Sequence, residues 1–188
     1  MAEALARLNG LHEHLCPRQV LGVRIGLLAA RELGFDVPLI DRRIHVVVET
    51  DGCFADGVTA ATGCAIGHRT LRAIDYGKIA ATLVDSGTGR AVRVWPSPDA
   101  RCLARDYAAD AGDRWHAQLT AYQAMPDEAL LRWQTGTVAM APSFSAIHPP
   151  PRVACEVCGE EIMGGRELTL DDRVFCRACS DGSYFAAD

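Results

Sequence analysis

The residues with the clearest chemical meaning are four cysteines near the end of the 188-residue chain. Cys155 and Cys158 form one C-x2-C pair, Cys176 and Cys179 form a second, and residues 159 to 175 separate the pairs. This spacing is typical of a zinc site, in which each pair turns both thiolates toward one ion at about 2.3 Å. We therefore expect one structural Zn2+ held by these four cysteines.

The segment that carries this quartet is too short to bury enough apolar surface to fold by itself. Metal binding supplies the missing folding free energy in modules of this size. Between the pairs, residues 167–170 and 173–175 flank Asp171 and Asp172, which predicts a short hairpin. We expect a zinc-ribbon-like module, and its exposed surface is a candidate site for a protein partner.

A second set of metal-binding residues stands near the start of the chain. His12, His14 and Cys16 occupy alternate positions, so an extended backbone would direct their three side chains the same way. Cys16 and Cys53 are each expected at a helix start, where the helix dipole favours the thiolate. Imidazole and thiolate together suit Zn2+. We therefore expect a second metal ion, Zn2+, with His14, Cys16 and Cys53 among its ligands.

Cys64 is a further candidate ligand for this second site. A continuous helix would separate Cys53 from Cys64 by about 16 Å along its axis, which is too far to share one ion. Either the chain bends at Gly63, or only one of the two cysteines joins the site and Cys64 is a small buried residue. His68 is near Cys64 in the sequence and could line the same pocket. The remaining candidates are expected to have structural roles: Cys102, His45, His116 and His148.

The elements that must position these residues follow from the hydrophobic pattern and its punctuation. Leu21, Ile25 and Leu28 recur at helical spacing after Pro17, and Gly34 suits a helix end. The run at 44–49 is rich in β-branched residues and predicts a strand that leads into Cys53. The expected elements are helices at 17–34, 54–62, 99–118 and 127–133, and strands at 44–49, 78–84, 90–95 and 135–141.

Composition limits the class of protein. The formal net charge of -5 is spread along the chain, which gives nucleic acid no basic patch to recognise, so we expect no nucleic-acid binding. Neither a secretory leader nor a stretch of membrane-spanning length is evident, so we expect a cytoplasmic protein without a membrane anchor. Eight cysteines in that compartment are metal ligands or reactive thiols more often than disulfides.

The run His148-Pro149-Pro150-Pro151 cannot continue a helix or a sheet, so it predicts a stiff linker. We place an α+β metal-binding domain at residues 1–147, the linker at 148–154 and the zinc module at 155–188.

Several motifs, in one order, resemble the FmdE family, which is named for formylmethanofuran dehydrogenase. They are H-E-H-L-C-P at 12–17, E-T-D-G-C-F-A-D at 49–56, T-G-C-A-I-G-H at 62–68, D-Y-G-K at 75–78 and S-G-T-G-R-A-V-R at 86–93. The resemblance implies an α+β fold with a mixed sheet and packed helices, and a homodimer in solution. It also implies metal binding near His14, Cys16, Cys53 and Cys64. Glu13 and Arg18 stand where the family often has glycine.

Three functions compete at this point. The first is an accessory role in one-carbon or molybdenum/tungsten enzyme metabolism, through metal or sulfur handling. The second is a metal-dependent enzyme that acts on a small molecule, with Glu13, Glu49 or Asp56 as the base. The third is an interaction protein stabilised by zinc. No motif for molybdopterin, nucleotide or an iron–sulfur cluster is evident, so the dehydrogenase reaction is not assigned to this chain.

Overall fold

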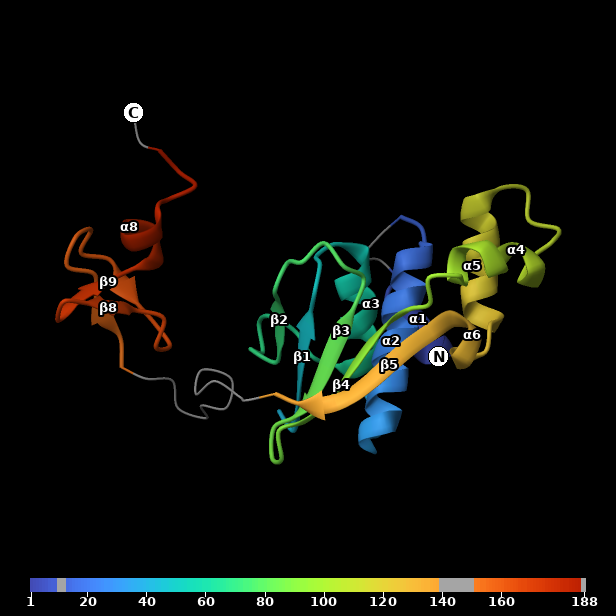
Figure 1. Ribbon diagram of the computed structural model, residues 1–188, viewed down its shortest axis with the longest axis horizontal. Helices are drawn as coiled ribbons and strands as arrows, with labels where there is room; N and C mark the ends of the chain where they lie inside the picture. Colours follow the sequence, from blue (N-terminus) through green and yellow to red (C-terminus); the bar gives the residue numbers. More distant parts are fainter. Residues whose placement is uncertain (10–12, 139–150, 187–188) are drawn as a thin grey trace. The chain divides into compact units, whose positions relative to one another are not determined.

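The computed structural model describes residues 1–9, 13–138 and 151–186 (Figure 1). The chain divides into two compact units, Met1–Ala139 and Met140–Asp188, and each is considered by itself. The first residues of the predicted linker, 148–150, lie outside the described residues. Its last two residues, Val153 and Ala154, form a strand of the second unit, so the folded module includes residues that were predicted to belong to the linker. None of the described helices is long and apolar enough to cross a membrane.

The first unit is built on one mixed sheet with helices packed against it. The strands follow the order β2-β1-β3-β4-β5; β2 pairs with β1 in parallel, and the other pairs are antiparallel. This arrangement confirms the predicted α+β class. The elements in chain order are α1 (Ala2–Ala6), α2 (Pro17–Leu33), β1 (Ile44–Val48), α3 (Cys53–Thr62), β2 (Leu71–Ala73), β3 (Ala81–Asp85), β4 (Arg90–Pro96), α4 (Ala100–Tyr107), α5 (Arg114–Ala124), α6 (Asp127–Leu130) and β5 (Leu131–Thr137).

Helix α2 begins and ends where its sequence signals predict. Cys16 is the N-cap in an extended conformation, and its backbone N–H donates to the Gln19 side-chain oxygen at 2.8 Å. Pro17 occupies the first turn, where a missing N–H costs nothing. Gly34 ends the helix with φ 81°, a left-handed conformation that glycine adopts without strain. These local signals place Cys16 at the start of the helix.

Helices α2 and α3 touch through their backbones because both carry glycine at the crossing. A Cβ on Gly22 would lie 3.0 Å from the Gly57 Cα, and a Cβ on Gly26 would lie 2.8 Å from the Ala61 Cβ. Contact positions therefore advance along both helices together, so the helices run in the same direction. Their N-termini consequently lie at the same end of the pair.

The sheet buries one face under these helices. Val46 on β1 pairs with Leu83 on β3, which pairs with Val92 on β4, and all three are fully buried. The alternate positions carry Thr82 and Arg93, which are only half-buried. This alternation has the period of two expected of a sheet with one packed face.

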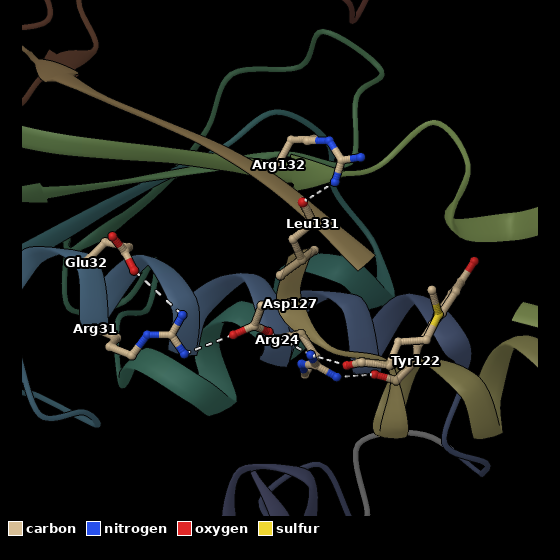
Figure 2. Close-up of polar contacts among 8 residues, drawn as sticks. Arg24, Arg31, Glu32, Tyr122, Asp127, Leu131 and Arg132 are labelled. Atoms are coloured by element: carbon tan, nitrogen blue, oxygen red, sulfur yellow. Dashed lines mark hydrogen bonds and ion pairs between the residues drawn. The ribbon is translucent and has the colours of Figure 1, made fainter. Parts of the chain in front are cut away.

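A network of charged groups fixes α5 and α6 to α2 (Figure 2). The Arg24 guanidinium donates to the backbone oxygens of Tyr122 and Met125, both at 2.7 Å, and to the Asp127 carboxylate at 2.6 Å. Arg31, two turns further along α2, donates to the other Asp127 oxygen at 2.9 Å. The carbonyls at the end of α5 are thereby satisfied by a side chain of α2, and this determines where α5 lies on the unit.

Two predicted elements differ from the structure. The single helix expected at 99–118 is two helices, α4 and α5, because the segment at 108–113 contains Gly112 and the N-cap Asp113, which accepts from the His116 N–H at 2.9 Å. The last strand begins at Leu131 instead of residue 135, directly after α6, because it extends the sheet beside β4. The part of that prediction at 139–141 lies outside the described residues.

The second unit contains two small hairpins and a short helix. Asp171 and Asp172 turn the predicted hairpin with positive φ angles of 49° and 61°, which is the geometry that matches the twist of two paired strands. The elements are β6 (Val153–Ala154), β7 (Glu161–Ile162), β8 (Leu168–Leu170), β9 (Arg173–Phe175) and α8 (Arg177–Asp181).

Candidate metal centres and the adjoining cleft

The four cysteines of the second unit form one cluster, as the sequence predicts. The Sγ atoms of Cys155, Cys158, Cys176 and Cys179 all lie within 4.8 Å of one another. Cys158 Sγ and Cys176 Sγ are 3.9 Å apart, close to the edge of about 3.8 Å that a tetrahedron of sulfurs has when Zn–S is about 2.3 Å. The quartet therefore has the composition and dimensions of a four-thiolate zinc site.

Backbone N–H groups prepare this cluster for a cation. Gly159 has φ 75°, and the chain folds back there so that its N–H donates to the Cys155 carbonyl at 2.9 Å. The N–H groups of Cys158, Cys176 and Val157 point at the Cys155 sulfur and lower its pKa to about 6. The thiolate that zinc requires is thus stabilised by the fold at this position.

The other sulfurs of the quartet show what a dication would contribute. The neighbouring Cys176 side chain, followed by burial, raises the pKa of Cys179 to about 12. Sulfurs this close cannot all be ionised in the absence of a positive charge, because thiolates repel each other. A bound Zn2+ neutralises that repulsion, so the donor set fits the metal.

In the first unit, Cys16 and Cys53 lie against each other at the paired N-termini of α2 and α3. Burial raises the pKa of the Cys53 thiol, and the adjacent Cys16 side chain raises it further. Both side chains are half-buried and line one cleft. The structure thus brings together the two cysteines that were predicted to share a site.

The remaining candidates of this site do not join the pair as closely. His14 is exposed two residues before Cys16, and His12 lies outside the described residues. Among the residues that the structure describes, the tail quartet is the only group of three or more His, Cys, Asp or Glu side chains positioned to hold an ion. The described part of the first unit therefore offers two adjacent thiols with a histidine nearby, and not a closed ligand set.

Cys64 is separated from this pair, which decides between the two geometries that the sequence leaves open. Helix α3 continues to Thr62 without a bend, so Cys64 lies beyond the opposite end of the helix from Cys53. Cys64 is 1% exposed, and its thiol donates to the Ile44 carbonyl at 3.6 Å. It is a core residue, and burial raises the pKa of its thiol. His68 is exposed in the loop after it, and Cys102, which was expected to pack, is exposed on α4.

Glu49 is paired, which bears on its predicted role as a base. The Arg93 guanidinium donates through Nε to one Glu49 oxygen at 2.5 Å and through Nη2 to the other at 2.7 Å. This double hydrogen bond holds the pKa of Glu49 below its usual value against the opposing effect of burial. A carboxylate in this state is a poor proton acceptor, so Glu49 positions the ends of β1 and β4 and is not suited to general base catalysis.

The cleft beside the cysteine pair has a volume of about 610 Å3. Its walls come from the start of α2, the start of α3, α4 and α5, and they include Arg18, Arg101, Arg114 and Trp115. No acidic side chain of the described residues lines it. The sequence analysis missed these four residues because they lie on helices whose common cleft is created by the way α4 and α5 fold back on α2.

Comparison with known proteins agrees with this architecture. The model of the family described as "FmdE, Molybdenum formylmethanofuran dehydrogenase operon" matches residues 11–133, and that of the prokaryotic dksA/traR C4-type zinc finger matches residues 151–184. An FmdE-like protein of tungsten formylmethanofuran dehydrogenase from Syntrophus aciditrophicus has a similar fold. Its crystal structure matches with a TM-score of 0.65 at 23% identity, over 98% of this chain and 94% of that one.

A curated relative is a "Probable S-adenosyl-L-methionine-binding protein" of Archaeoglobus fulgidus, which is 28% identical over 99% of this chain. The present chain spans 54% of that protein, about half its length. The family model covers residues 11–133, well over half of the chain. The tail that follows is a C4-type zinc finger, and its four cysteines are clustered as zinc requires. The protein is therefore a metal-binding member of the FmdE family.

Proposed function

We propose that the first unit binds a second metal ion, Zn2+, through Cys16 and Cys53, with His14 as a nitrogen ligand. The observation that carries this proposal is the contact between the two cysteines at the mouth of a cleft. Two adjacent thiols resist ionisation of both sulfurs, and a dication removes that penalty. Both cysteines also stand at helix starts, where the dipole favours negative charge.

The metal content of purified variants tests this proposal. Cys16→Ser should lose one zinc equivalent relative to the wild-type chain and keep the fold. Cys102→Ser is the matched control, because Cys102 is an exposed cysteine of the same unit and does not line the cleft. Equal zinc content in wild type and Cys16→Ser would reject the second site.

The role proposed for the protein is accessory: metal or sulfur handling for one-carbon or molybdenum/tungsten enzyme metabolism. The family name supports the context, and the two half-buried thiols beside an open cleft support exchange of a bound ion. A chromogenic chelator should remove zinc in two phases, the fast phase coming from the cleft site. The fast phase should disappear in Cys16→Ser and persist in Cys102→Ser.

A second candidate function is a metal-dependent enzyme that acts on a small molecule. The cleft favours it, since its volume of about 610 Å3 lies within the range of about 300–1,000 Å3 that small-molecule sites occupy. The name of the Archaeoglobus relative offers S-adenosyl-L-methionine as one ligand to test. Turnover that requires both the cleft metal and a cleft ligand would favour the enzyme over the accessory role.

We also propose a cytoplasmic homodimer and a protein partner for the zinc module. Residues 54–66, whose apolar character suggested a dimer surface, are mostly α3 and its C-cap, and the buried part of α3 packs against α2 within one subunit. The dimer would therefore use another surface of the first unit, such as the sheet face that carries Thr82. Sedimentation of the full chain at micromolar concentration tests it, and a monomer would contradict it.

A further inference from the structure

The cleft beside the cysteine pair has a charge that the protein as a whole does not have. The chain carries a formal net charge of -5, yet Arg18, Arg101 and Arg114 line this cleft together. These three side chains have no ion pair or hydrogen bond with the described residues. Guanidinium groups gathered without a counter-ion form a local positive potential that concentrates anions.

The arginines come from three different helices that the fold holds in place. Arg18 is in the first turn of α2, Arg101 is in the first turn of α4 and Arg114 begins α5. The network around Asp127 and Arg24 fixes α5 against α2, so the separation of these cationic groups is set by the core and not by loops. Such a group is built to hold one anion from several sides.

An aromatic surface lies in the same cleft. Trp115 follows Arg114 and is 41% exposed, although its indole has a fixed neighbour in His116 at 4.8 Å between ring centroids. Tyr122, two turns further on the same helix, also lines the cleft. A large, oriented aromatic side chain left open beside cationic groups is a surface on which a planar ring can stack.

We infer that this cleft binds a small organic anion whose planar ring lies on Trp115 and whose phosphate or carboxylate is held by Arg101 and Arg114. The inference deepens the proposed function, and rests on it only in placing this ligand next to the Cys16–Cys53 metal. It also separates ligand classes: S-adenosyl-L-methionine has a planar ring and a carboxylate but carries a net positive charge. Three arginines with no acidic neighbour among the residues lining the cleft disfavour that charge.

Titration calorimetry of the full-length protein at low ionic strength tests the inference. AMP supplies a ring with a phosphate, and nicotinate supplies a ring with a carboxylate. Adenosine and ribose 5-phosphate each supply only one half of the AMP ligand. We expect AMP or nicotinate to bind at about 0.1 mM or tighter, S-adenosyl-L-methionine to bind more weakly than the better of them, and the half-ligands to lose about tenfold or more.

Variants then locate the binding. Arg101→Gln combined with Arg114→Gln should weaken the binding of the anion about tenfold or more, because two charge-assisted contacts are lost. Trp115→Ala should weaken the ringed probes and leave ribose 5-phosphate unchanged. Arg105→Gln is the matched control: Arg105 is exposed on α4 and does not line the cleft, so its loss should change the affinity by less than about twofold.

The two proposals fail separately in this design. Cys16→Ser should lose the second zinc and retain binding of the anion, since the arginines remain. Anion binding by a wild-type protein that holds only the tail zinc would leave the inference standing and reject the metal at Cys16 and Cys53. Absence of binding for AMP, nicotinate and ribose 5-phosphate at about 1 mM, or binding that the double arginine variant leaves intact, overturns the inference.

Discussion

Cys16 and Cys53 open two helices that run in the same direction, and their side chains lie against each other where those helices begin. The residues are far apart in the sequence, and the glycines that let α2 and α3 touch bring them together. The geometry of the candidate metal site therefore depends on backbone contacts one to two turns away from it.

The glycine crossing gives a first prediction. A methyl group at Gly57 would collide with the Gln19 backbone oxygen, which cannot move out of the way as a side chain would. Gly57→Ala should lower the free energy of unfolding by about 2 kcal/mol or more and separate the two cysteines. Chemical denaturation measures the first effect and zinc content the second.

Gly67→Ala is the control for this substitution, because a Cβ at Gly67 would meet nothing within 4 Å. A Gly57→Ala protein as stable as this control would mean that the two helices do not cross through their backbones.

The Glu49–Arg93 pair gives a prediction about pH. The hydrogen bonds from Arg93 place the pKa of Glu49 below the ordinary 4.5 in the folded chain. The stability from this pair is therefore complete above the unfolded pKa and is lost as pH falls through the lower, folded pKa. Glu49→Gln should cost about 2 kcal/mol at neutral pH, and this difference should shrink on acidification below about pH 4.5.

Thermal or urea unfolding across that pH range measures the difference between wild type and Glu49→Gln. Glu128→Gln, an exposed glutamate on α6, should show no such dependence. A deficit for Glu49→Gln that stays constant down to acid pH would show that the charge of Glu49 is not what Arg93 stabilises.

The network in Figure 2 predicts a large effect for a single carboxylate. The Arg24 side chain is 11% exposed and that of Asp127 is 18% exposed, so removal of the carboxylate leaves a largely buried guanidinium with carbonyl partners alone. Asp127→Ala should destabilise the first unit by about 2–4 kcal/mol. Glu128→Ala, one position further on α6, should change stability by less than about 0.5 kcal/mol. Equal values for the two variants in urea titrations would contradict the role given to Asp127.

The tail zinc gives a prediction that separates the two units. Cys155→Ser should release the tail zinc and unfold residues 153–181, because the module depends on the metal for its folding free energy. The first unit should keep its unfolding midpoint, since its core lies within Met1–Ala139. Amide hydrogen exchange resolves the two effects. Protection of the tail in a zinc-free Cys155→Ser protein would show that the module folds without metal.

Sequence alone predicts much of this fold because many of its signals are local. Pro17 and Gly34 delimit α2, the β-branched run before Glu49 gives β1, and the spacing of the tail cysteines gives the zinc site. Each of these depends on residues close in the chain, where steric preference and metal geometry leave few alternatives.

The parts that could not be predicted depend on tertiary contacts. The short parallel strand β2 owes its existence to pairing with β1, and β5 starts at Leu131 because β4 lies beside it. The separation of Cys64 from the cysteine pair required knowing that α2 and α3 run in the same direction. Gly22 and Gly57 carried that signal, since glycine in a helix interior costs stability and is kept where backbones approach closely.

The function proposed for the first unit depends on a metal ion bound by Cys16 and Cys53 together. Titration of Co2+ into the Cys155→Ser/Cys158→Ser protein isolates this site, because the tail site is disabled and thiolate ligands of Co2+ give a charge-transfer absorption. We predict that this band appears and saturates at one equivalent, and that it is lost when either Cys16→Ser or Cys53→Ser is added but not when Cys102→Ser is added. A titration without the band, or a band that survives both Cys16→Ser and Cys53→Ser, would show that the two cysteines do not form a metal site.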